Sequence, residues 1–466
     1  MHKYCILSII ICLCACDVGR EYKIEDFISD EQIKNTLNLE NNGKKISIKW
    51  YEIFNDKDLN TLLKDAGFYN LSLRQGKEKL LQARYLYMIN TKETLPMFNA
   101  NFEYDFSKAN NSKDILNNSN FFRTGFDVSW EIDLWGKSKN VSSQYYEIIN
   151  KAKYSIANTL ISLEGELISN YISLRLAQEK LKIANKNLRL QENILRIVKD
   201  KYNTGLEDKL ALNKEQILLE KTKTDIPVLL TEIEKYKNAI FILSGKTAKD
   251  LSVNLDNFQN NITSKTFKYN IKDLYKLPLD VIRSRPDVKM AEASIKSQNS
   301  YLNQAIIDLY PSLSLEASFV FLSSRGSNLF NSDNQIYGYN PKISIPIWQW
   351  GKLVNNIELQ KHIKEEYILN YNEVTLTALY DIKNAITGIE QAFNKCRLLE
   401  NSLYTMRDVL DISKEKYKNG LIDFSTLAES EQNFLDTENS YIEANSDVLK
   451  SITSFYKACG GGYSFK

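Results

Sequence analysis

The chain has 466 residues, and its 60 Lys and Arg residues nearly balance 58 Asp and Glu residues, which leaves a net charge of +2. This balance excludes a strong field for nucleic acid, and the presence of only two histidines, His2 and His362, excludes a histidine-rich metal cage or a catalytic histidine dyad. No apolar run reaches the roughly 18 residues of a spanning helix, so a membrane crossing would require a β-barrel.

Residues 2–15, HKYCILSIIICLCA, begin with a short basic stretch and continue as an apolar core too short to span a bilayer. They end in Leu13-Cys14-Ala15-Cys16, which resembles the lipobox of bacterial lipoproteins. We expect residues 1–15 to be a signal peptide and Cys16 to be lipidated, which would anchor the chain stably in a membrane. An ordinary signal peptide is the alternative. Asp17 leaves the final membrane open, because in enterobacteria this residue after the cysteine tends to hold lipoproteins at the inner membrane.

Residues 16–56 are expected to form a lipid-anchored N-terminal segment. Beyond Cys16 the chain has two cysteines, Cys396 and Cys459, and no CxxC motif. The cysteine pattern therefore excludes a zinc ribbon and a redox motif, and we expect no metal and no cofactor. Whether the two cysteines pair is left open.

Strict alternation of apolar and polar residues predicts two strands, at about 96–107 and 121–135. In the first strand Phe98, Ala100 and Phe102 alternate with Asn99 and Asn101. Alternation over about ten residues is typical of membrane β-barrel strands, with apolar side chains outward and polar side chains inward. A soluble sheet with one hydrated face is the alternative.

A very long helix is predicted after these strands, from about residue 138 to 202. It carries a seven-residue ladder at Leu167, Leu174, Leu181, Leu188, Leu195 and Tyr202. A sustained heptad favours coiled-coil packing, and a helix of this length would extend about 95 Å, which suits the crossing of a periplasm. A plain structural coiled coil is the alternative. The helix ends at Gly205, a C-cap glycine, but capping does not explain the apolar Leu206 at an exposed tip, which suggests a docking surface.

The chain repeats itself at one fixed offset. Leu95-Pro96 matches Tyr310-Pro311, with an offset of 310 − 95 = 215. The same offset relates SWEIDLWGK (129–137) to SIPIWQWGK (344–352), KYNTGL (201–206) to KYKNGL (416–421), and SG (244–245) to CG (459–460). Four anchors in one register indicate a duplicated unit. We expect a first repeat at 57–255, a linker at 256–276 and a second repeat at 277–466.

The second repeat is expected to have strands at about 311–322 and 336–348. Its heptad ladder is Ile382, Ile389, Cys396, Leu403, Leu410 and Tyr417, and its tip carries Gly420 and Leu421. Four strands cannot close a barrel, because the smallest membrane barrels have about eight, and an open edge in lipid leaves backbone groups unpaired. Several chains must therefore share one barrel.

Several stretches resemble the outer-membrane factor lipoproteins of tripartite efflux systems, the TolC-like or NodT-like family. They are SWEIDLWGK, LPLDVIRSRPDVKMAEASI (277–295), YPSLSL (310–315), the two KY-x-x-GL tips, and Trp50-Tyr51 followed by Phe54. The resemblance covers nearly the whole chain after the signal. The chain departs from the family at Arg20, where proline usually follows Gly19, and at the tips, which carry lysine where arginine is common.

The resemblance implies a mainly α fold with a membrane β-barrel part. In this TolC-like tandem-repeat fold, a homotrimer closes a 12-stranded barrel in the outer membrane, and coiled-coil helices form a periplasmic α-barrel. It implies a passive conduit for small molecules, not an enzyme, driven by an inner-membrane pump. A periplasmic adaptor would open the conduit at the tip residues Tyr202, Gly205, Leu206, Tyr417, Gly420 and Leu421.

The resemblance also implies an acidic constriction after the second tip, at Glu429, flanked by Asp423 and Glu431. Three copies of a carboxylate around a trimer axis would favour cations and repel one another. The equivalent residue of the first repeat is Lys214, so an interprotomer Glu429–Lys214 pair is a hypothesis. The alternative is that Glu429 is a solvated coiled-coil residue.

Two other functions stay open at this point. A type I protein secretion channel shares the fold, and gene neighbours would separate it from efflux. A non-channel coiled-coil envelope lipoprotein would lack a trimeric barrel.

Overall fold

The computed structural model describes residues 22–39, 47–107, 119–256 and 276–462. The predicted signal peptide and Cys16 lie outside these residues, as does nearly all of the predicted linker. The chain divides into two compact units. One comprises Glu78–Lys153 and Met290–Asn372 with the N-terminal residues up to Glu25, and the other comprises Asp26–Lys77, Tyr154–Lys289 and Glu373–Lys466.

The elements recur along the chain at the offset seen in the sequence. The first series is α4 (Leu71–Lys92), β1 (Met97–Ser107), β2 (Ser119–Ile132), α5 (Lys137–Asn203) and α6 (Lys209–Ser244). The second is α7 (Pro286–Ile307), β3 (Ser312–Ser323), β4 (Gln335–Ser344), α8 (Lys352–Lys418) and α9 (Phe424–Ala458). Helix α8 starts 352 − 137 = 215 residues after α5 and ends 418 − 203 = 215 residues after it. The duplication is therefore structural as well as sequential.

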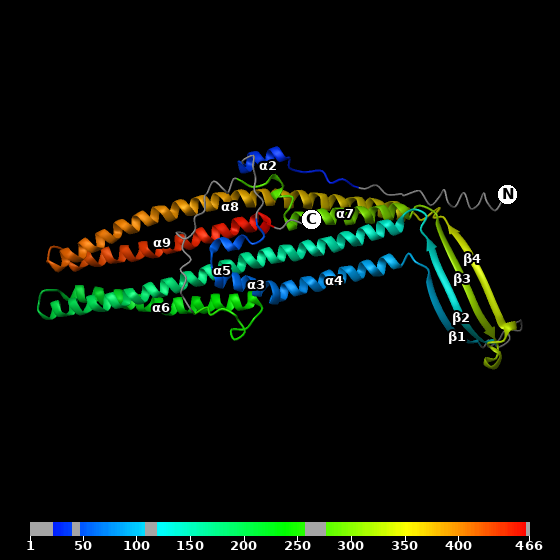
Figure 1. Ribbon diagram of the computed structural model, residues 1–466, viewed down its shortest axis with the longest axis horizontal. Helices are drawn as coiled ribbons and strands as arrows, with labels where there is room; N and C mark the ends of the chain where they lie inside the picture. The colour runs from blue at the N-terminus through cyan, green and yellow to red at the C-terminus, as the bar shows by residue number, and fades with distance from the viewer. Residues whose placement is uncertain (1–21, 40–46, 108–118, 257–275, 463–466) are drawn as a thin grey trace. The chain divides into compact units, whose positions relative to one another are not determined.

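The four strands form one antiparallel sheet in the order β1-β2-β3-β4 (Figure 1). Its polar face is held by cross-strand contacts. Glu103 of β1 is opposite Arg123 of β2, with 3.9 Å between their charged groups, and Arg123 also pairs with Asp127 at 3.3 Å. Opposite charges placed directly across from each other help to set the pairing of the two strands.

The other face of the sheet is apolar and aromatic. Phe98 of β1 is 76% exposed, and Tyr337 and Tyr339 of β4 are 80% and 81% exposed. Such a broad exposed aromatic surface requires a partner or an apolar solvent, because water disfavours it.

Helices α5 and α8 have 67 residues each, and each is therefore about 100 Å long. The second ladder is buried at Ile382, Ile389, Cys396, Leu410 and Tyr417, as the heptad predicted. The first is buried at Leu167 and Leu174 but only half-buried at Leu181, Leu188 and Leu195 and exposed at Tyr202. Asn187, Gln191 and Val198 are buried there instead. An α-helix drifts by about 20° per heptad, so a seven-residue ladder leaves the packed face unless the helix supercoils to follow it.

None of the helices in the described residues contains a stretch that is both long and apolar enough to span a membrane.

The N-terminal segment packs through several contacts, among them an aromatic turn and a polar network. Trp50, in a 3₁₀ turn at Trp50–Phe54, is 2% exposed and stacks on Tyr456 of α9 with ring centroids 4.8 Å apart. The next helix, α3 (Lys57–Tyr69), is capped by Asp56, whose carboxylate accepts a hydrogen bond from the Leu59 N–H at 2.9 Å.

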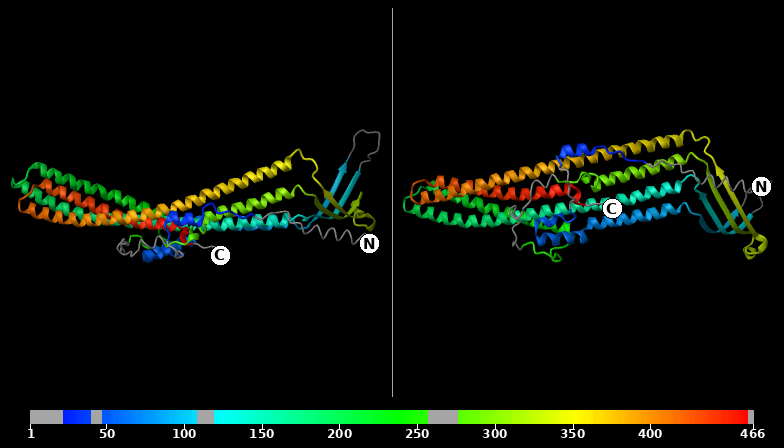
Figure 2. Two further views of the ribbon diagram at one scale, coloured as in Figure 1. Left: turned by 90° about the horizontal axis from the view of Figure 1, so that it is seen from above. Right: turned by 45° about the horizontal axis from the view of Figure 1, so that its top comes forward.

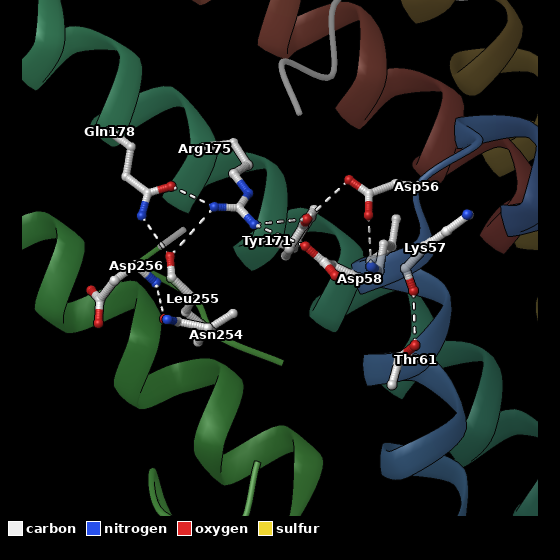
Figure 3. Close-up of polar contacts among 11 residues, drawn as sticks. Asp56, Lys57, Asp58, Thr61, Tyr171, Arg175, Gln178, Asn254, Leu255 and Asp256 are labelled. Carbon is white, nitrogen blue, oxygen red and sulfur yellow. Dashed lines mark hydrogen bonds and ion pairs between the residues drawn. The ribbon is translucent and has the colours of Figure 1, made fainter. Parts of the chain in front are cut away.

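Asp56 also belongs to a polar network on α5 (Figure 3). The Tyr171 hydroxyl donates to Asp56 at 2.9 Å and accepts from Arg175 at 3.0 Å. Gln178 donates to the carbonyl of Leu255 at 2.8 Å. The network therefore joins the start of α3 and the end of the first repeat to the same stretch of α5.

Arg285, in one of the family-typical stretches, is 9% exposed at the start of α7. Its guanidinium donates to the carbonyl of Ala458 at 2.8 Å and to Asp287 at 2.7 Å. This arginine thus satisfies a carbonyl at the C-terminal end of α9, where the helix has no backbone donor left.

Candidate functional site

The candidate site is the pair of tips at which α5 turns into α6 and α8 turns into α9. Gly205 and Gly420 have φ of +75° and +72°, in the left-handed region, as predicted. At each tip the N–H after the glycine donates back to a lysine carbonyl: Leu206 to Lys201 and Leu421 to Lys416, both at 2.8 Å. These are Schellman caps, which a side chain at the glycine would strain.

Both tips present an apolar side chain to solvent. Leu206 is 76% exposed and Leu421 is 72% exposed. The two hairpins lie at the same end of their unit (Figure 2). The backbone caps hold both leucines in place without burying them, so they are available as apolar contacts for another protein.

The two tip tyrosines differ, although the sequence treats them alike. Tyr202 is 38% exposed, whereas Tyr417 is 7% exposed and donates a hydrogen bond of 2.9 Å to Glu207. The Lys201 ammonium lies 3.9 Å from the centroid of the Tyr417 ring. Burial, and next the bond to Glu207, raise the pKa of Tyr417. Tyr417 therefore joins the two tips within one chain, and its part in docking stays a prediction.

The residues expected at the gate occupy different environments. Asp423 caps α9 and accepts from the Thr426 N–H at 2.9 Å, and the bonds from Thr426 lower the pKa of its carboxyl. Lys214 of α6 donates to the Ser425 hydroxyl at 3.0 Å. Glu429 is exposed one turn further along α9. Within one chain Lys214 is thus next to the start of α9, and the interprotomer Glu429–Lys214 pair stays a prediction.

Glu431, expected to flank the constriction, is buried, with 8% of the residue exposed. It interacts electrostatically with Glu215 of α6, which is 0% exposed and which was not among the residues predicted at the gate. Glu215 comes four residues after the buried Ala211 and four before the buried Leu219. This spacing places Glu215 on the packed face of the helix, so the sequence pattern could have predicted its burial. Across the described residues no group of three or more His, Cys, Asp or Glu side chains is arranged to hold a metal ion.

These features define a class: a chain with a four-stranded antiparallel sheet, long helical hairpins and apolar capped tips, as in TolC-like outer-membrane channels. The chain belongs to the outer membrane efflux protein family, whose model matches residues 62–245 and 277–461. The assignment confirms the resemblance noted from the sequence, and with it the function of an outer-membrane efflux channel and the localisation in the outer membrane.

Similar proteins cover nearly the whole chain. The cation efflux system protein CusC of Escherichia coli K12 is 25% identical over 419 residues, 89% of this chain and 88% of its own. The probable outer membrane lipoprotein SilC of Salmonella typhimurium is 23% identical over 421 residues, again 89% and 88%. Nodulation protein T of Rhizobium leguminosarum bv. trifolii is 22% identical over 430 residues, 91% and 90%.

Solved structures show the same fold. The CmeC outer membrane channel of Campylobacter jejuni matches with a TM-score of 0.87 and 22% identity, over 96% of both chains. The outer-membrane channel OprN matches with a TM-score of 0.86 and 24% identity, over 96% of this chain and 99% of its own. The predicted TolC-like fold class is confirmed.

Proposed function

We propose that three copies of this chain form one passive conduit for small molecules across the outer membrane. In this proposal a lipid on Cys16 helps to anchor the complex, a periplasmic adaptor docks on the tips, and an inner-membrane pump supplies the driving force. The observation that carries the proposal is the four-stranded sheet with an aromatic face, because it is too small to close alone.

The sheet supports the shared barrel through its two edge strands. In the described sheet β1 pairs only with β2, and β4 only with β3. The free edges would leave backbone donors and acceptors unsatisfied in lipid, at a cost of several kcal/mol per group. Pairing β1 of one copy with β4 of the next satisfies both edges, and three copies supply twelve strands.

The polar face of the sheet would then line the pore, and its charges favour cations. The acidic residues on this face outnumber the basic ones: Glu103, Asp105, Asp127, Glu131 and Glu316 against Arg123 and Lys342. Rings of carboxylates attract cations and repel anions. Similar proteins are named for cation efflux, pyoverdine export and toluene efflux, and these names do not agree on one kind of substrate. We therefore infer the cation preference from the charges on this chain's own sheet.

The tips support docking and gating at the periplasmic end. Leu206 and Leu421 offer apolar contacts to an adaptor, and docking that separates the two hairpins would break the Tyr417–Glu207 bond. Glu429 stands on the exposed side of α9, where three copies could form the acidic constriction. A channel for type I protein secretion would need the same opening of the tips. The genes that neighbour this one therefore still decide between small-molecule efflux and protein secretion.

Conductance of the purified protein in planar bilayers tests the proposal. We expect discrete steps and a reversal potential, measured in a salt gradient, that indicates cation preference. Glu316→Lys should shift the reversal potential toward anions, whereas the exposed helix variant Glu232→Lys, far along the chain from the sheet, should leave it unchanged. A protein that inserts but never conducts would contradict the channel, and an unmoved reversal potential in Glu316→Lys would remove the polar face from the pore.

A further inference from the structure

The bundle at the tips encloses a pair of carboxyl groups. Glu215 of α6 is 0% exposed, and neither of its carboxyl oxygens has a hydrogen-bond partner in the described part of the chain. Glu431 of α9 is 8% exposed, and the two groups repel each other electrostatically. Because a single chain already covers Glu215 completely, no neighbouring copy or adaptor can reach it while the bundle stays closed.

The surroundings of the pair are apolar. The bundle is packed from α5, α6, α8 and α9 by Val198, Ala211, Leu410, Tyr417, Phe424, Leu427 and Ala428. On α6, buried Ala211 and Leu219 lie one turn before and one turn after Glu215. Among the described residues this environment gives neither carboxyl oxygen of Glu215 a hydrogen-bond partner.

The charged and titratable groups around the pair do not neutralise Glu215. From α8, Lys414 acts on Glu431 and lowers its pKa against the burial that raises it. Tyr417, also on α8, gives its hydroxyl to Glu207, and on α5 Lys201 lies over the Tyr417 ring. The charge that acts on Glu215 is that of Glu431, a like charge from α9, and the charge of Glu215 in turn adds to the raised pKa of Tyr417.

A buried carboxylate without a partner is strongly disfavoured, and two adjacent carboxylates cannot both ionise without a large further cost. Burial, and next the charge of Glu431, raise the pKa of Glu215 to about 8. In water both groups would ionise near their ordinary pKa, well below neutrality. Opening the bundle to water therefore releases a proton at neutral pH.

We propose that Glu215, paired with Glu431, is a proton-binding site that couples protonation to the closure of the tip bundle. A proton on Glu215 keeps the α6–α9 contact closed, and its loss favours separation of the two hairpins. The sign follows from linkage: the closed state binds more protons than the open state, so rising pH shifts the population toward the open one. The coupling between protonation and tip closure goes beyond the proposed function. The effect of this coupling on a pore rests on the proposed channel function.

Hydrogen exchange of the full chain in detergent, read from peptides that cover the tips, tests the coupling directly. After correction for intrinsic exchange, we expect the protection of residues 209–222 and 424–435 to fall at least about tenfold between about pH 6 and pH 9. Glu215→Gln should abolish this dependence, because a neutral amide cannot ionise. Glu232→Gln, an exposed change on the same helix, should retain it.

A second variant separates the pair from simple burial. Glu431→Gln removes the like charge, so we expect the pH at which protection falls to move downward. Equal protection at both pH values in the wild type, a retained dependence in Glu215→Gln, or an unmoved midpoint in Glu431→Gln would overturn the proposal. The exchange result decides the coupling whether or not the protein conducts, and absence of conductance would overturn only the proposed channel.

Discussion

Tyr417 on α8 donates a hydrogen bond of 2.9 Å to Glu207, which lies 210 residues earlier, at the tip of the other hairpin. Tyr417 is buried, and the Lys201 ammonium covers its ring at 3.9 Å. The tips of the two repeats are thus joined within one chain by a phenol, a carboxylate and an ammonium. The Tyr417–Glu207 link is one hydrogen bond to a carboxylate, so about 1.5–3 kcal/mol of docking energy is enough to break it.

Tyr417→Phe should loosen the tips without unfolding the chain. It removes one hydrogen bond to a carboxylate, which contributes about 1.5–3 kcal/mol, and keeps the ring in the bundle. We expect faster hydrogen exchange in residues 204–210 and 419–423. The matched control is Tyr202→Phe, at the equivalent position of the first repeat, which should leave both segments unchanged. Equal effects of the two variants would show that the buried bond does not join the tips.

Replacement of the tip leucines should weaken adaptor docking. Leu206→Asp and Leu421→Asp place a charge where each side chain is more than two-thirds exposed, so the fold should tolerate them. We expect each to lower the affinity for the adaptor by at least about tenfold, because a contact surface loses an apolar anchor and gains a charge to desolvate. Leu206→Met and Leu421→Met preserve the apolar surface and should bind as the wild type does. Undiminished binding of the Asp variants in surface plasmon resonance would move the docking site elsewhere.

Gly125 in β2 should not accept a side chain. A Cβ there would lie 2.2 Å from the Phe319 carbonyl oxygen and 2.5 Å from the Val320 Cα, both backbone atoms of β3. Gly125→Ala should therefore lower the thermal stability of the sheet, by about 1–3 kcal/mol, the usual cost of overpacking. Gly338→Ala in β4, where a Cβ meets nothing within 4 Å in the chain, is the control. The check is the temperature at which the β signal in circular dichroism is lost; if both variants melt alike, the close approach of β2 to β3 is wrong.

Glu164 should make the N-terminal segment sensitive to pH. It is 8% exposed on α5, and burial raises its pKa to about 7, against a smaller lowering by the Trp50 indole. A raised carboxyl pKa favours the protonated form in the folded state, so stability is complete below the ordinary value of about 4.5 and falls as pH rises through 7, by up to about 3 kcal/mol.

Trp50 reports this change because its ring packs beside Glu164. Fluorescence of the wild type minus that of Trp50→Phe should titrate with a midpoint near pH 7. Glu164→Gln should flatten the curve, and Glu166→Gln, an exposed change two residues further on, should not. A flat wild-type curve would show that Glu164 is not titrating beside the indole.

Much of the architecture could be predicted because it depends on local periodicity. The strands were expected at about 96–107 and 311–322 and lie at Met97–Ser107 and Ser312–Ser323, since alternation is a property of each strand alone. The fourth strand ends at Ser344, although the alternation continued to 348. Its partner strand β3 begins at Ser312, which is opposite Ser344, so the residues after Ser344 have no strand to pair with in the described sheet.

The tips were harder to predict because their differences arise from packing between the repeats. Two nearly identical motifs place Tyr202 at the surface and Tyr417 in the bundle, since Tyr417 meets Glu207 and Phe424 while the equivalent partners of Tyr202 differ. The burial of Glu215 and Glu431 was hard to predict for the same reason, because packing between helices decides it. A glutamate within a helical heptad is usually solvated, and only the face shared with Ala211 and Leu219 pointed to its burial.

The mass of the detergent-extracted complex tests the shared barrel most directly. Native mass spectrometry of the membrane-extracted protein should give three chain masses, because four strands per chain must be shared among copies to leave no open edge in lipid. The substitution Tyr339→Pro in the edge strand β4 should lower the amount of the three-chain species and raise the amount of the single-chain species. A wild-type protein that is extracted from the membrane folded, with its β signal intact, and has one chain mass would contradict the account.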